Sequence, residues 1–299
     1  MRTSAFFSLV AAAFSVNAVP QLEKRAAPVI DDTTILNYAL TLEHLENAFY
    51  TGGLAKFDEA AFVECGLPVW ARGRFVEVGE HEKTHVQLLQ TALGSAATKP
   101  CNYSFPYNDA KSFAALSQVL EGVGTSAYTG AAQFITSKAV LTTAASILAT
   151  EARHASWIGS AVNKGPGWSG AFDVPLSLNE VFTLAAAFIT SCPSTNPQLP
   201  VKAFPSLAFS SPAPGKQSTL TFNATGTSSS TPLFVSFFTG LSQEFAPLKN
   251  GKVTIPGDLL GTVYAVVTTN GTMADDSNIV AGPAVLSFPF NSDGNLISQ

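Results

Sequence analysis

The chain has 299 residues, of which 46% are hydrophobic and only 12% are charged, and its formal net charge is -5 at pH 7. This length suits two domains, and the composition allows a large buried core. The acidic balance leaves no basic patch, which argues against nucleic acid as a partner. No CxxC motif is present among the three cysteines, which argues against iron–sulfur or structural zinc sites.

Residues 1–25 have the features of a secretory targeting segment in the usual order. Arg2 precedes an apolar run at 5–16 that is too short to span a bilayer, and small residues at 16–18 offer a cleavage site. Lys24-Arg25 then resembles a dibasic processing site of fungal pro-peptides. We therefore expect a secreted protein, extracellular or in the cell wall. No later run is long enough for a membrane helix, and the polar C-terminus argues against a lipid anchor.

Helical periodicity dominates the chain up to Pro193. Asp31-Asp32 can cap the first helix, and Gly52-Gly53 is expected to end it. The second helix should stop at Gly94, and a long connection with two prolines follows at 95–109. The predicted helices cover about residues 31–52, 66–93, 111–136, 140–162 and 177–191, the last with a capping box at Ser177–Glu180.

Short β-rich runs separated by Gly, Asn and Pro follow residue 200. They predict strands at about residues 218–223, 233–238, 252–255, 262–268 and 284–290. Residues 226–230 can also be read as a disordered linker. The fold class expected is mainly α, a four-helix bundle plus a fifth helix, with a small C-terminal β-sandwich-like domain. The expected parts are a targeting segment (1–25), a helical bundle (26–195) and a β-rich domain (196–299).

Two of the predicted helices carry a Glu-x-x-His motif. Glu82 and His85 lie on the second helix, and Glu151 and His154 lie on the fourth. Residues three apart project from the same helix face, so one carboxylate and one imidazole of each motif can reach the same metal ion.

The other two long helices each carry a glutamate in apolar surroundings. Glu43 is followed seven residues later by Tyr50, and Glu121 is followed seven residues later by Tyr128. Seven residues return a helix to within about 20° of the same direction. The tyrosines are either core aromatics or hydrogen-bond partners of the ligand carboxylates.

This alternation of glutamates and Glu-x-x-His motifs is typical of carboxylate-bridged di-iron and di-manganese bundles. Four carboxylates can neutralise two adjacent divalent cations, and two neutral imidazoles complete the ligand set. Carboxylate and imidazole ligands suit iron and manganese. The predicted ligands of two iron or manganese ions are Glu43, Glu82, His85, Glu121, Glu151 and His154.

The stretch ILNYALTLEHLENAFY at residues 35–50 resembles the secreted fungal ferritin-like group linked to stress and starvation, within the ferritin/rubrerythrin superfamily. The resemblance covers about residues 33–192. It implies a ferritin-like bundle with a long crossover at 95–109, and it implies Glu43 as the first-helix ligand. Glu46, one turn away, remains a rival to Glu43. No ferritin cage is implied, because an appended domain makes cage assembly harder.

Three functions from different classes remain open at this stage. The first is a redox metalloprotein whose partners are metal ions and small oxidants. The second is a secreted zinc peptidase, because residues 81–85 match H-E-x-x-H, with His81 and His85 as ligands and Glu82 as general base. The third is a non-enzymatic cell-wall or surface scaffold. The sequence defines no substrate and no oligomeric state, and enzymatic activity remains open.

Several smaller features complete the expectations. Cys65 precedes the second helix and Cys101 lies on the crossover, so we expect these two to pair and Cys192 to be free. Glycosylation sequons begin at Asn102, Asn223 and Asn270. Gly122 and Gly124 are unusual inside a helix and indicate either close packing at the metal layer or a local break.

Overall fold

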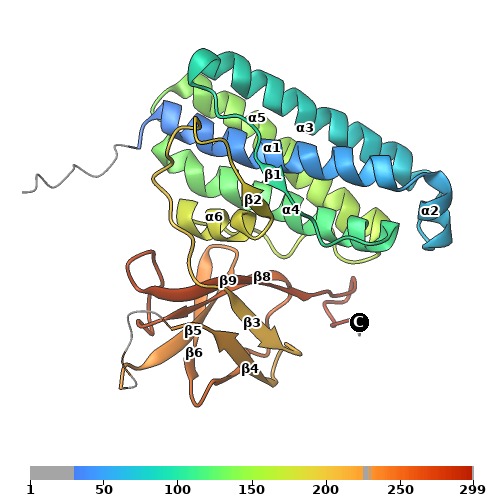
Figure 1. Cartoon of the computed structure of the whole chain (residues 1–299). Helices are drawn as coiled ribbons and strands as arrows, with labels where there is room; N and C mark the ends of the chain where they lie inside the picture. Colours follow the sequence, from blue (N-terminus) through green and yellow to red (C-terminus); the bar gives the residue numbers. More distant parts are fainter. Residues whose placement is uncertain (1–29, 225–227, 229, 298–299) are drawn as a thin grey trace, which may run out of the picture.

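The computed structural model describes residues 30–224, 228 and 230–297, and Figure 1 shows a helical bundle lying against a smaller β domain. The predicted targeting segment at 1–25 lies outside the described residues, as does most of the stretch at 226–230. The predicted fold class, a helical bundle with a small β domain, is confirmed.

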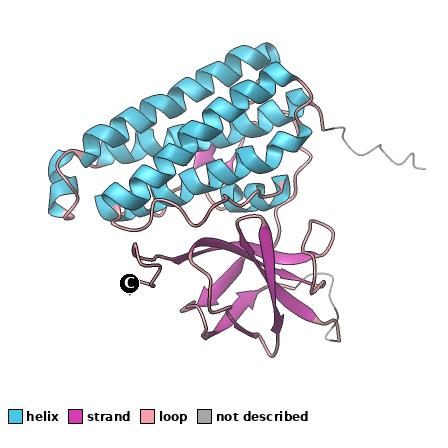
Figure 2. Ribbon diagram, turned by 180° about the vertical axis from the view of Figure 1, so that it is seen from behind, coloured by secondary structure: helices cyan, strands magenta, loops and turns pink. Residues whose placement is uncertain are grey.

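Four long helices form the bundle (Figure 2). Helix α1 packs mainly against α3, and α4 packs mainly against α5. A short helix, α2, follows α1, and α6 lies on the side of the bundle that faces the β domain (Figure 1). The bounds are α1 Asp32–Lys56, α2 Glu59–Glu64, α3 Ala71–Leu93, α4 Ala110–Ala131, α5 Lys138–Trp157 and α6 Leu178–Ala186. A π-helical turn, Ile158–Val162, continues α5. None of the described helices has both the length and the apolar character needed to cross a membrane.

Side-chain caps begin the helices where the sequence indicated. Asp31 accepts a hydrogen bond from the backbone N–H of Thr34, and Ser177 and Glu180 complete the capping box of α6. Gly94, with φ 55°, ends α3 as predicted.

The expected end of the first helix at Gly52-Gly53 was wrong, because α1 continues to Lys56. A Cβ atom added to Gly53 would lie 2.3 Å from the ring of Phe113 on α4. The glycine therefore serves close helix packing and does not end the helix. Helix α4 likewise continues through its glycines, Gly122 and Gly124, so the local break considered for that helix does not occur.

The crossover between α3 and α4 runs along the bundle and contains β1 (Asn102–Tyr103), which pairs with β2 (Ile189–Ser191) after α6. The antiparallel register places Asn102 opposite Ser191, and the adjacent Cys101 and Cys192 form a disulfide. The predicted Cys65–Cys101 pair was therefore wrong. Cys65 follows α2 at one end of the bundle, whereas β1 lies midway along it (Figure 1), and the Cys65 thiol is free.

The β domain consists of two antiparallel sheets packed face to face. One sheet has the order β3-β4-β7 and the other has the order β6-β5-β8-β9. Their core includes the fully buried side chains of Val235, Phe237 and Ile255. The strands are β3 Leu207–Ser210, β4 Gln217–Phe222, β5 Leu233–Thr239, β6 Ser242–Leu248, β7 Lys252–Thr254, β8 Gly261–Thr268 and β9 Ile279–Phe288.

The core of the bundle continues into the β domain. Phe238, Tyr264 and Val266 belong to the same buried cluster as the bundle's own apolar residues. Tyr264 on β8 donates a hydrogen bond to the carbonyl oxygen of Gly122 and accepts one from the hydroxyl of Ser126, both on α4. The β domain is thus attached to the helix that carries Glu121.

Candidate metal centre

Each of the four long helices supplies one glutamate to the middle of the bundle. Glu43 comes from α1, Glu82 from α3, Glu121 from α4 and Glu151 from α5, and all four have no exposed surface. His85 and His154, one turn after Glu82 and Glu151, are 9% and 6% exposed. Burying several carboxylates in an apolar core is costly unless they bind cations or protons.

These six residues form two groups that could each hold a metal ion. One group contains Glu43, Glu82, His85 and Glu151, and the ligand atoms all lie within 4.8 Å of one another. The other contains Glu82, Glu121, Glu151 and His154 at the same spacing. Ligand atoms about 2.0–2.2 Å from one ion lie at most about 4.4 Å apart, so each group needs only small adjustment to close on an ion. Glu82 and Glu151 belong to both groups and are placed to bridge.

The imidazole nitrogens point toward the carboxylates. His85 Nδ1 lies 3.3 Å from an oxygen of Glu43 and 3.2 Å from oxygens of Glu82 and Glu151. His154 Nδ1 lies 3.2 Å from Glu82 and 2.9 Å from Glu121. One N–H cannot donate well to two or three acceptors at once, so neither imidazole satisfies all the carboxylates around it.

Several buried carboxylate oxygens in the cluster have no hydrogen-bond donor, which shows whether a metal ion would fit there. Among the described residues, nothing donates a hydrogen bond to Glu43 Oε2, Glu82 Oε1 or either carboxylate oxygen of Glu151. Buried polar atoms nearly always have a hydrogen-bond partner. A bound ion is one of the few explanations for a group of buried oxygen atoms that have none. The donors are oxygen and imidazole nitrogen only, the set that iron and manganese accept. The residues present therefore fit a pair of such ions.

Burial and the two imidazoles set the protonation of the site. Burial raises the pKa of Glu43 to about 7 and the pKa of Glu151 well above its usual range. Burial also opposes ionisation of Glu82, but the nearby imidazoles of His154 and His85 outweigh it and lower the pKa of Glu82 to about 2. Burial alone would lower the histidine pKa values, yet the surrounding carboxylates raise the pKa of His85 to about 12 and of His154 to about 9. Protons thus stabilise the cluster until cations replace them.

The two tyrosines connect α1 and α4 by hydrogen bonds to the glutamates. Tyr128 donates to Glu43 Oε1 at 2.5 Å, and Tyr50 donates to Glu121 Oε1 and also pairs with the hydroxyl of Ser117. Each tyrosine pairs with the glutamate of the other helix, because seven residues along its own helix correspond to about 10.5 Å. The bonds orient one carboxylate of each group.

His81 lies outside both groups. Its Nδ1 is 2.9 Å from His154 Nε2, the two rings are stacked, and its side chain is exposed. His81 therefore connects a buried imidazole to the surface. A zinc peptidase would need His81 and His85 on the same ion, whereas here Glu82 faces the ligand cluster and His81 does not.

Glu46 is a further buried carboxylate beside the site. It lies outside both ligand groups, yet a Cβ atom added to Gly124 would be 3.0 Å from Glu46 Oε1 and 3.1 Å from Glu151 Oε2. Glu46 thus lies beside Gly124, as does the bridging Glu151. Its position one helix turn after Glu43 was a sequence signal for Glu46. No such signal indicated the contact of His81 with His154 or that of Ser117 with Tyr50.

The remaining sequence candidates lie apart from the cluster. His44 is buried by packing, and its Nε2 is 3.2 Å from the carbonyl oxygen of Thr98. Of the sequon asparagines, Asn102 and Asn223 are exposed, whereas Asn270 is partly buried and accepts hydrogen bonds from Thr272 in a turn.

Comparison with known proteins supports the assignment made from the geometry. A family model described as a ferritin-like domain matches residues 31–164. Protein rds1 of Schizosaccharomyces pombe is 28% identical over 183 residues, an alignment that covers 60% of this chain and 45% of the relative. The chain thus spans less than half the length of this curated relative. Residues 31–164 therefore match a ferritin-like domain, and the chain is similar to a fungal protein over 60% of its length.

Proposed function

We propose that this protein is a secreted metalloprotein whose bundle binds two iron or two manganese ions and uses them to oxidise ferrous iron or to reduce oxygen or peroxide. The observation that carries the proposal is the pair of four-residue groups that share Glu82 and Glu151 inside the core. Shared carboxylates hold two cations close together, which a site for a single structural ion does not require.

The protein's own residues have distinct parts in this proposal. Glu43 and His85 would hold one ion, Glu121 and His154 the other, with Glu82 and Glu151 between them. Two such ions, when bound, supply the electrons for reduction of a small oxidant. The tyrosine hydroxyls fix the orientation of Glu43 and Glu121. His81 offers a route by which His154 Nε2 can exchange a proton with solvent.

Secretion, a role in stress and glycosylation belong to the same proposal. Secretion is supported by the targeting features of residues 1–25 and the dibasic Lys24-Arg25, glycosylation by the sequons, and the role in stress by the resemblance of residues 35–50. The Cys101–Cys192 disulfide is consistent with an oxidising compartment. Small oxidants and metal ions are then the proposed partners, and the β domain is the proposed attachment or spacing unit of an extracellular or wall protein.

The test is oxygen or peroxide consumption by full-length protein reconstituted with ferrous iron or manganese without air. Wild type should consume the oxidant faster than the free metal does. Glu121→Ala, which removes a ligand of one group only, should lose this acceleration. Equal rates for wild type, Glu121→Ala and free metal would contradict the redox function. Zinc-dependent peptide cleavage that disappears in His81→Ala and persists in Glu121→Ala would instead establish the peptidase.

A further inference from the structure

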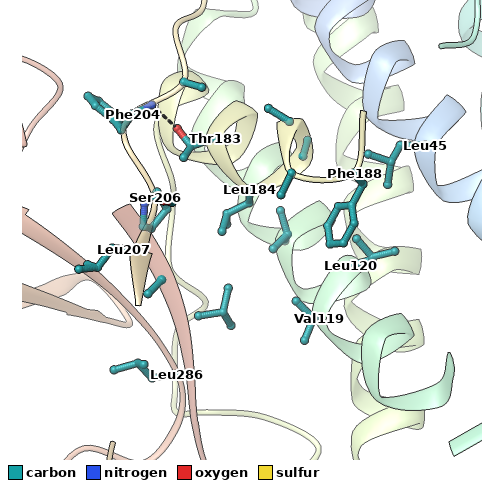
Figure 3. Close-up of a pocket in the computed structure, with 18 of the residues that line it drawn as sticks. Leu45, Val119, Leu120, Thr183, Leu184, Phe188, Phe204, Ser206, Leu207 and Leu286 are labelled. Atoms are coloured by element: carbon teal, nitrogen blue, oxygen red, sulfur yellow. Dashed lines mark hydrogen bonds between the residues drawn. The ribbon is translucent and has the colours of Figure 1, made fainter. Parts of the chain in front are cut away.

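A cavity of about 600 Å³ lies between the helical bundle and the β domain. Its walls come from α1, α4 and α6 on one side and from β3 and β9 on the other. Figure 3 shows Leu45, Leu120 and Phe188 on the bundle side, facing Leu207 and Leu286 of the β domain. The volume is that of a pocket for a small organic molecule.

The lining is almost entirely apolar. Only three lining residues have polar side chains, namely Glu46, Thr183 and Ser206. The hydroxyl of Thr183 donates to the carbonyl oxygen of Asn179 and accepts from the N–H of Phe204, the contact drawn in Figure 3, so it is already partnered. Ser206 is exposed, as are the lining residues Ala203 and Ala208, which places these residues at the opening.

Glu46 differs from the other two polar residues because it is both buried and without a partner. It is 5% exposed, its carboxyl group makes no hydrogen bond to any residue that the structure describes, and burial and the charge of Glu151 raise its pKa. A buried carboxyl group that faces an apolar cavity without a partner is costly in either protonation state. The cavity therefore contains one unsatisfied polar group at the end that meets the bundle.

The position of Glu46 connects the cavity to the metal centre. Gly124 lines the cavity as well, and Glu46 Oε1 and Glu151 Oε2 both lie close to the point where a Cβ atom of residue 124 would stand, at 3.0 Å and 3.1 Å. A molecule that reached Glu46 would thus lie next to one of the two bridging glutamates.

We propose that this cavity binds an uncharged, mostly apolar alcohol or phenol, with its hydroxyl group on Glu46. The hydrophobic walls exclude a charged molecule, and a carboxylate on Glu46 would repel an anionic group. A hydroxyl both donates and accepts, so it pairs with an ionised or a protonated carboxyl group alike. A ligand without a polar group would leave Glu46 unsatisfied.

The probes are 2-naphthol, naphthalene and 2-naphthoate, which share one ring system and differ in the group offered to Glu46. Equilibrium dialysis against the full chain should show 2-naphthol bound about tenfold more tightly than naphthalene, the effect of one hydrogen bond to a buried group. The naphthoate should bind no better than naphthalene. Equal affinities for naphthol and naphthalene, or tightest binding of the anion, would overturn the proposal.

Two variants locate the binding. In Glu46→Leu the preference for naphthol should disappear while naphthalene still binds. Ala208→Trp, at the exposed opening, should weaken both aromatic compounds at least about tenfold, whereas Ala139→Trp, exposed on α5 away from the cavity, should leave both unchanged. A preference that survives Glu46→Leu, or binding unaffected by Ala208→Trp, contradicts the assignment.

Binding of the alcohol needs no metal ion, so this test is separate from that of the redox function. Chelator-treated protein should keep the preference for naphthol. Loss of the preference after chelation would mean that a metal ion, and not Glu46, holds the hydroxyl group, and would overturn the proposal even where the metal centre is established.

Discussion

At Gly124 the absence of a side chain leaves room for two carboxylates. A Cβ atom there would be 3.0 Å from Glu46 Oε1 and 3.1 Å from Glu151 Oε2. Two residues earlier, a Cβ atom on Gly122 would have no neighbour closer than 4.0 Å. The two glycines are thus a matched pair on one helix, one beside the metal centre and one outside it.

Gly122→Ala should raise the free energy of unfolding by up to about 1 kcal/mol, because alanine is the better helix former. Gly124→Ala should forgo that gain and should bind less metal, since Glu151 must move to make room. Denaturant unfolding and metal content, each measured with and without added metal, check this pair. Equal stability and equal metal content in the two variants would show that Gly124 does not constrain the site.

Among the elements, the paired strands β1 and β2 connect the crossover to the segment after α6, and the Cys101–Cys192 disulfide covalently closes a loop with a sequence separation of 91 residues. Cross-links of such loops stabilise small domains by about 2–5 kcal/mol. Cys101→Ser and Cys192→Ser should each lower the free energy of unfolding by about that amount. Cys65→Ser, at the free thiol, should change it little. Mass mapping that recovers a Cys65 disulfide would contradict the pairing.

The first turn of α6 contains a buried carboxyl group whose ionisation opposes folding. Burial raises the pKa of Glu180 from 4.5 to about 7, while its hydrogen bond from the Ser177 N–H works in the opposite direction. The folded state favours the protonated form of Glu180. The stability that this protonation contributes is therefore complete below about pH 4.5 and is lost as pH rises through about 7.

Glu180→Gln, which stays neutral and preserves the capping box, should therefore be more stable than wild type at pH 8 by up to about 3 kcal/mol. At pH 4.5 the two proteins should differ little. Unfolding by denaturant at both pH values measures this, and a difference that does not change with pH would mean that Glu180 is not the titrating group.

The sequence predicted elements well where local signals agree with tertiary packing. The caps at Asp31 and Ser177 and the glycine at Gly94 mark real helix ends, because each satisfies backbone groups locally. The helix end predicted at Gly53 was wrong because this glycine is required by its close contact with Phe113, which a local sequence pattern does not reveal. The strands β3 and β6 were missed for related reasons: β3 is short, and β6 contains Pro247 and a glutamate, both of which weaken a strand pattern.

For the site, the sequence could identify residues that share a helix face but could not show how the faces combine. The spacing of Glu82 with His85 and of Glu151 with His154 follows from one helix turn. The exchange of partners, with Tyr128 on Glu43 and Tyr50 on Glu121, depends on how α1 and α4 are offset. The cystine pairing likewise depends on strand register, and the cavity depends on the position of the β domain.

On the scale of the whole molecule, metal binding should be coupled to protons. The pKa of His85 is raised to about 12 and that of His154 to about 9, so both imidazoles are charged at neutral pH in metal-free protein. Metal ligands must be deprotonated, so binding releases these protons. Affinity should rise about tenfold per pH unit for each proton released between pH 6 and 8. Competition with a chelator at several pH values measures this, and a pH-independent affinity would contradict it.

The β domain contacts the bundle close to the ligand cluster. Tyr264 bonds to α4 at Gly122 and Ser126, and the interdomain cavity ends at Glu46. The candidate metal centre therefore lies beside the domain interface. The buried ligand cluster inside the bundle and the apolar cavity between the domains thus meet at Glu46 and Gly124.

The central claim is that two ions share Glu82 and Glu151, and elemental mass spectrometry of purified full-length protein loaded with iron or manganese tests it most directly. Wild type should hold about two ions per chain, one for each ligand group. Glu151→Ala should lose both, because it belongs to both groups, while Glu46→Gln, outside them, should keep both. A single zinc ion retained in Glu151→Ala, or no metal in wild type after reconstitution, would contradict the di-metal centre.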